Sequence, residues 1–319
     1  ALQDEEGNFF FVIESGFNEP PMLISTTPDR ILRWKRNDLA IDPRTERGHP
    51  KIALTQNKRL LVTCADRSKL YILEAEDGET AAILDEPSIV GESPEQYFSM
   101  RNIFDFGIFP DNTLLLYRIC NRKDQYGSFY DLQRFDLNGN LLPLWDPAAA
   151  NLSFFEKVKK LFSASSIPHS ILDMKDFPVG SRETDVRLTI GIDGSVYLLS
   201  FIRLVKLTPE GRKLYAIELP CHYTQGRAAV NEQGEAFVVG CREEDRVEIL
   251  KVSPDGSNVT AAVKSIVDGG PLEYDGVLTL SPDGGFSLLG YSDRWIDIKT
   301  NQNEKQMNKD SRSIFESNT

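Results

Sequence analysis

Residues 188–214 read LTIGIDGSVYLLSFIRLVKLTPEGRKL, two apolar runs of strand length set between tight turns. The run from Val196 to Leu199 follows a turn at Gly194, and a second turn follows at Gly211. Glycine tolerates the positive φ that tight hairpin turns require. The stretch therefore predicts a strand, a tight turn, a second strand, a polar loop, a third strand and another tight turn.

This unit recurs along the chain. Residues 228–259 (AAVNEQGEAFVVGCREEDRVEILKVSPDGSNV) repeat it, and further copies begin at Ala53, Phe106 and Leu278. The first turns align at Gly7, Asn57, Asn112, Gly194, Gly234 and Gly284, and the second turns at Asp29, Gly78, Gly139, Gly211, Gly256 and Asn301. Units of this size are typical of propeller blades, which bury their faces by packing around an axis. We therefore expect an all-β, six-bladed β-propeller, with seven blades as the alternative.

The spacing of turn residues and strand residues also resembles that of a known group of proteins. The stretches IDGSVYLLS (192–200) and VSPDGS (252–257) resemble the six-bladed propellers of the NHL, TolB-like and gluconolactonase-like group. The resemblance covers nearly the whole chain but rests on turn glycines and strand residues, so it implies a fold and no activity. Gluconolactonase-like enzymes hold a divalent metal at the axis with acidic and asparagine side chains, and Asp105, Asp185 and Asp275 precede or begin innermost strands here. We expect no cofactor and no metal, with an axial divalent metal as the alternative.

One large insertion interrupts the repeats. We assign residues 1–300 to a single propeller domain and residues 146–184 to the insertion. Ser153 and Glu156 have the spacing of a capping box, which predicts a helix near 153–164. Its apolar stripe consists of Phe154, Phe155, Val158, Leu161 and Phe162. The helix either covers apolar surface of the propeller or serves for docking, to a partner protein, which we favour, or to an anionic membrane surface.

The two ends of the chain bear on how the propeller closes. Residues 1–3 are too few, on this reading, for an innermost strand of the first unit. Residues 301–319 form either a polar tail or a closing strand, and we favour a return of Ser313–Phe315 that joins the last blade to the first.

Arginine recurs in the loops between the second and third strands. These loops open on one face of the disk, where binding sites converge on propellers. The candidate residues of this loop face are Arg67, Arg122, Arg203, Arg242 and Arg294, with Tyr126 and Trp295 as aromatic anchors. They are either solvated ion pairs of small energetic effect or a ring suited to a carboxylate or an acidic peptide.

The cysteines bear on the cellular compartment. Cys221 precedes the innermost strand of the unit whose second strand ends at Cys241, so adjacent antiparallel strands bring the two together. They form a disulfide if the protein is exported, or remain two buried thiols. The chain begins without methionine, which fits a processed secretory protein or a trimmed chain. We expect a secreted or periplasmic protein, with the cytoplasm as the alternative.

Charge and motifs narrow the function. With 48 acidic and 36 basic residues the chain has a net charge of −12, which disfavours broad nucleic-acid binding, and it has no apolar run long enough to span a membrane. No catalytic or phosphate-binding motif is present in the sequence. We expect a non-catalytic, monomeric scaffold that binds another protein through its loop face and inserted helix. The alternatives are a metal-dependent lactonase or hydrolase with an axial site, and an anion or small-ligand sensor; whether it is an enzyme stays open.

Overall fold

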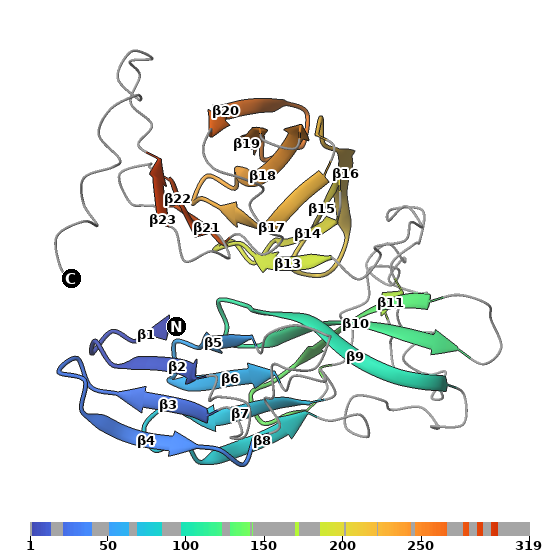
Figure 1. Cartoon of the computed structure of the whole chain (residues 1–319). Helices are drawn as coiled ribbons and strands as arrows, with labels where there is room; N and C mark the ends of the chain where they lie inside the picture. Colours follow the sequence, from blue (N-terminus) through green and yellow to red (C-terminus); the bar gives the residue numbers. More distant parts are fainter. Residues whose placement is uncertain are drawn as a thin grey trace, which may run out of the picture.

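The computed structural model describes residues 2–13, 22–39, 51–63, 69–84, 97–122, 128–140, 142, 170–171, 186–200, 202–221, 223–243, 246–266, 277–280, 286–289 and 295–298. Throughout these ranges the regular structure is β-strand (Figure 1). The all-β prediction is confirmed. The predicted helix at 153–164 lies outside the described residues.

The strands form antiparallel sheets in strict chain order. The first sheet contains β1 (Leu2–Gln3), β2 (Phe9–Ile13), β3 (Met22–Thr26) and β4 (Leu32–Arg36). The second contains β5 (Ile52–Leu54), β6 (Arg59–Thr63), β7 (Leu70–Glu74) and β8 (Thr80–Leu84). The third contains β9 (Tyr97–Ile108), β10 (Leu114–Arg122), β11 (Ser128–Phe135) and β12 (Ser170–Ile171).

The second half of the chain repeats this pattern. The fourth sheet contains β13 (Arg187–Ile190), β14 (Val196–Ser200), β15 (Arg203–Leu207) and β16 (Lys213–Glu218). The fifth contains β17 (Tyr223–Val230), β18 (Ala236–Glu243), β19 (Arg246–Val252) and β20 (Val259–Ile266). In the described part of the sixth, β21 (Val277–Leu280), β22 (Phe286–Leu289) and β23 (Trp295–Ile298) are paired.

Each sheet packs face to face against the next one in the chain. Five apolar clusters lie between consecutive sheets and join the first to the second, and so on to the sixth. Between the third and fourth, for example, Leu115 and Leu132 pack with Leu188 and Val205. Antiparallel sheets stacked in chain order with their first strands inward are the blades of a β-propeller. The blade number of six stays a prediction.

The predicted turns are present among the described residues, but in two of them the residue with positive φ lies one position later than predicted. In five described first turns an N–H donates to the carbonyl oxygen three residues earlier, as in Gly194 to Gly191 at 2.9 Å. The donor has positive φ at Gly7, Asn112, Gly194 and Gly234, as predicted. In the second sheet it is Lys58 (φ 61°) and not Asn57, and in the second turn of the first sheet it is Arg30 (φ 64°) and not Asp29. The hydrogen-bond spacing fixed the left-handed position there, whatever residue occupied it.

Two further details differ from expectation. Leu2–Gln3 are sufficient for an innermost strand: Leu2 lies opposite Phe10 and Gln3 opposite Phe9. The expectation that these residues are too few was wrong, while residues 301–319 lie outside the described part. Within the 146–184 insertion, Ser170–Ile171 form the outermost strand of the third sheet and pair with Asp131 and Leu132 of β11. This part of the insertion therefore belongs to a blade.

Candidate functional site

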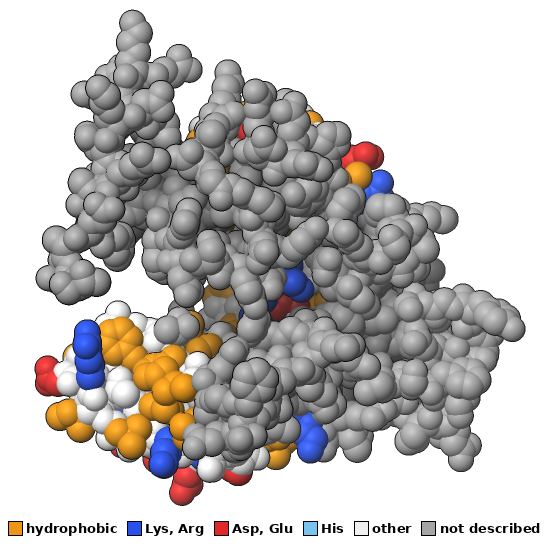
Figure 2. All heavy atoms as spheres, viewed as in Figure 1, with side chains coloured by type: hydrophobic (Ala, Val, Ile, Leu, Met, Phe, Trp, Pro, Cys, Tyr) orange, Lys and Arg blue, Asp and Glu red, His pale blue; other side chains and the backbone are white. Residues whose placement is uncertain are grey.

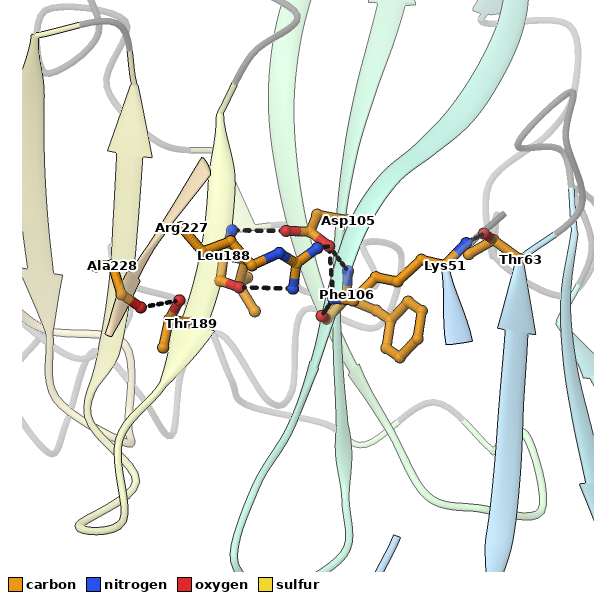
Figure 3. Close-up of polar contacts among 8 residues, drawn as sticks. All are labelled: Lys51, Thr63, Asp105, Phe106, Leu188, Thr189, Arg227 and Ala228. Atoms are coloured by element: carbon orange, nitrogen blue, oxygen red, sulfur yellow. Dashed lines mark hydrogen bonds and ion pairs between the residues drawn. The ribbon is translucent and has the colours of Figure 1, made fainter. Parts of the chain in front are cut away.

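A buried carboxylate lies where the innermost strands of four sheets meet. The Asp105 side chain, on β9, has no exposed surface. Its Oδ1 accepts from Lys51 Nζ at 2.6 Å, from Arg227 Nη2 at 2.5 Å and from its neighbour's amide, Phe106 N, at 2.8 Å. Its Oδ2 accepts from Leu188 N at 2.7 Å (Figure 3). We call Lys51, Asp105 and Arg227 the axial cluster.

The members of the axial cluster hold equivalent places in their repeats. Each lies four residues before the first residue of its blade's first tight turn, and Arg187 of the fourth sheet does the same. The pairs are Lys51 and Thr55, Asp105 and Phe109, Arg187 and Gly191, and Arg227 and Asn231. Because the repeat places this position at a similar depth in the second to fifth sheets, Lys51, Asp105 and Arg227 meet at the axis. Sequence reasoning considered Asp105 but missed Lys51 and Arg227; this constant offset from the turns would have found them.

The axial cluster fixes the ionisation of Asp105. Burial by itself opposes the charged carboxylate, but the positive charges of Arg227 and Lys51 and the hydrogen bonds outweigh it and lower the pKa of Asp105 to about 2. Asp105 is therefore fully ionised at neutral pH.

Burial has the opposite consequence for Lys51. It lowers the pKa of the ammonium to about 7; Asp105 opposes this change, while the charges of Arg227 and Arg187 add to it. Of the groups named here, Lys51 is thus the one that changes charge near neutral pH.

Further contacts hold the cations in place. Lys51 Nζ also donates to the carbonyl oxygen of Phe106 and lies 4.0 Å from the centre of its ring. Arg227 Nη1 donates to the carbonyl oxygen of Leu188 at 3.4 Å. Beside them, Thr189 Oγ1 donates to the carbonyl oxygen of Ala228 at 2.8 Å and joins β13 to β17 (Figure 3). The cations are thus held by backbone of the third and fourth sheets as well as by Asp105.

The axial cluster is suited to holding negative charge. Asp105 already contacts two cations, which leaves it a poor ligand for a metal ion. Among the residues that the structure describes, no group of three His, Cys, Asp or Glu side chains could hold a metal. Asp185 and Asp275 lie outside those residues, and an axial metal stays an alternative.

The loop-face residues predicted from the sequence are placed only in part. Arg203 begins β15, where the register sets it opposite Glu218. The backbones of Arg122, Arg242 and Trp295 lie in β10, β18 and β23. Arg67, Tyr126 and Arg294 lie outside the described residues, as do Phe154, Phe155, Val158, Leu161 and Phe162. The contacts of the axial cluster described above are made by other residues.

The two predicted cysteine partners lie on adjacent strands of the fifth sheet. Cys241 in β18 is opposite Tyr223, two residues after Cys221. Cys221 also lies close to Gly240, because a Cβ at Gly240 would be 3.1 Å from the Cys221 Cβ. The disulfide itself stays a prediction.

Among the described residues, no helix is long and apolar enough to cross a membrane.

Comparison with known proteins supports the fold and nothing finer. No family model and no curated protein matches the chain. A solved Bacteroides caccae protein of unknown function is similar at 12% identity and a TM-score of 0.53, over 91% of this chain and 89% of that one. A gluconolactonase from Xanthomonas campestris (12% identity, TM-score 0.47, 91% and 82% covered) and BamB from Moraxella catarrhalis (13%, 0.44, 92% and 73%) also match. The TM-scores of the last two are too low to support an argument.

Proposed function

We propose that this protein is a non-catalytic propeller that binds another protein and acts as a scaffold. The observation that carries the proposal is the set of contacts that Asp105 makes between blades. With four donors on its two oxygens, Asp105 acts as a brace between blades.

The contacts of Asp105 favour a binding role because they join several blades at the axis. The contacts of Asp105 reach residues of the second, fourth and fifth sheets from its own place in the third. A scaffold that holds its loops in fixed positions lowers the entropy cost of binding a partner. The proposed partner surface is the loop face with the helix predicted at 153–164.

The proposal also covers the oligomeric state and the cellular compartment. We infer a protein that is monomeric by itself and resides in the periplasm or outside the cell, where a bond between Cys221 and Cys241 would persist. A count of free thiols under denaturing conditions tests this: two fewer free thiols support it, and four free thiols remove the bond.

The test of the scaffold function uses the full chain, because β12 lies within the insertion and a whole deletion would remove a strand. One variant replaces Phe154 and Phe155 by serine in the apolar stripe. A matched control replaces Lys157 and Lys159 by serine on the polar side of the same segment. Affinity capture followed by mass spectrometry should lose a partner with the first variant and keep it with the second.

The proposal fails if both variants capture the same proteins as the unchanged chain. It also fails if the purified protein hydrolyses lactones with added divalent ions and Asp185→Asn removes that turnover, which would favour the enzyme alternative.

A further inference from the structure

The axial cluster contains more positive than negative charge. With Lys51 protonated, Lys51 and Arg227 carry two positive charges around the single negative charge of Asp105. Arg187 adds to the positive potential, since its charge helps to lower the pKa of Lys51. This excess lies inside a chain whose net charge is −12. One carboxylate neutralises one cation, so the axial cluster retains one positive charge when Lys51 is protonated.

The cations also retain hydrogen-bond donors. An ammonium has three N–H donors and a guanidinium five. Within the described residues, Lys51 Nζ donates to Asp105 and to the Phe106 carbonyl. The Arg227 guanidinium donates to Asp105 and to the Leu188 carbonyl. Each side chain therefore has donors beyond those used by the brace.

Solvent reaches these cations but not the carboxylate. The side chains of Lys51 and Arg227 are 23% and 34% exposed, against 0% for Asp105. Figure 2 shows Lys and Arg side chains next to an Asp or Glu side chain between the two groups of blades. An anion in solvent therefore has access to the two cations, whereas the Asp105 carboxylate is covered.

We propose that Lys51 and Arg227 form an axial binding site for a carboxylate ligand. Both nitrogens lie within hydrogen-bonding distance of one oxygen of Asp105, so they are close enough together for a second carboxylate to contact both. Arginine binds planar carboxylates through two N–H groups, and a carboxylate supplies the single negative charge that the cluster lacks. The carboxylate belongs either to a small molecule or to the end of a peptide.

The site responds to pH through Lys51. Within the described part of the chain, the charged groups that act on Lys51 are Asp105, Arg227 and Arg187, and its pKa of about 7 lies far from that of Asp105, about 2. Arginines keep their charge throughout the working range. Between pH 6 and pH 8, Lys51 is therefore the member of this group that loses its proton. Carboxylate affinity should fall by about tenfold over this range, because binding is linked to the protonation of Lys51.

The test is a titration of the full-length protein with acetate at constant ionic strength, with chloride as the reference anion. ¹⁵N-detected NMR of the lysine ammonium groups and calorimetry should show saturable acetate binding at pH 6, about tenfold weaker at pH 8. Arg227→Gln should weaken it by about tenfold or more, since it removes a charged hydrogen bond. Lys58→Gln, which removes an exposed cation, should leave it unchanged.

Two further measurements complete the test. One identifies the source of the carboxylate, and the other replaces the Arg227→Gln variant if that variant does not fold. A short peptide with a free C-terminal carboxylate is compared with its amidated form, and tighter binding of the free peptide than of acetate assigns the site to a peptide end. If Arg227→Gln does not fold, the unchanged protein decides: acetate must raise its melting temperature more than chloride does. Equal effects of acetate and chloride, or an acetate affinity independent of pH, would overturn the proposal.

Discussion

Asp105 on β9 and Arg227 on β17 form an ion pair of 2.5 Å although 122 positions separate them and their sheets are not consecutive. The apolar clusters join each sheet to its neighbour, whereas this ion pair reaches past the fourth sheet to the fifth. It therefore couples blades that the apolar core does not join directly.

Replacing Asp105 by asparagine should destabilise the protein by about 3 kcal/mol, because the change leaves two cations without their buried counter-ion. Urea unfolding followed by circular dichroism measures the loss. The matched control is Asp38→Asn, which breaks the more exposed Arg36–Asp38 pair and should cost less than about 1 kcal/mol. Equal losses in the two variants would contradict a bracing role for Asp105.

Asp105 should also contribute to acid unfolding. Its pKa is about 2 in the folded protein against an ordinary value of 3.8, so the unfolded chain binds its proton more readily. Its stabilising contribution is therefore complete above pH of about 4 and is lost as the pH falls through about 2. Urea unfolding at pH 5 and at pH 2.5 should show a smaller pH dependence in Asp105→Asn than in the unchanged protein. Identical pH profiles would refute the assignment.

Gly107 should resist enlargement because the next blade occupies the space beside it. A Cβ at Gly107 would overlap Leu188 Cδ2 and lie 2.7 Å from Ile190 Cγ1. Gly107→Ala should cost about 1–3 kcal/mol. In a double-mutant cycle with Ile190→Ala, part of the loss should be recovered, since the second change makes room. If the two losses of stability simply add, the overlap of the new Cβ with Ile190 is not the cause of the destabilisation by Gly107→Ala.

Arg30 occupies a left-handed position that glycine adopts without strain. Its φ is 64°, and the residue is exposed. Arg30→Gly should raise the free energy of unfolding by about 0.5–1 kcal/mol, because relief of the left-handed strain exceeds the entropy cost of glycine. Asp29→Gly, one residue earlier, should instead destabilise. Thermal unfolding of both variants measures the two effects. If Asp29→Gly were the more stable variant, the left-handed residue of this turn would be Asp29 and not Arg30.

The strands and tight turns could be predicted from the sequence, whereas the contacts of Asp105 at the axis were not predicted. Turn residues and apolar runs report backbone conformation over a few positions, so strands and turns such as that at Gly194 were predictable. Asparagine at 57 and aspartate at 29 suggested the wrong left-handed residue, because the hydrogen-bond spacing outweighed residue preference at Lys58 and Arg30. The four-residue offset from the first turns marks Lys51, Asp105 and Arg227 as equivalent positions in the sequence, but which of them contact one another depends on how distant blades are arranged around the axis.

The equivalent positions of four blades carry charged residues of both signs: Lys51, Asp105, Arg187 and Arg227. The repeats are therefore alike in outline but not interchangeable. A protein rebuilt from identical copies of any one of these four would gather charges of a single sign at its hub and push its own blades apart. The place of the third unit, which supplies the one carboxylate among these four positions, is thus set at the hub, so exchanging it with another unit should disrupt the assembly even where every turn and every strand is kept.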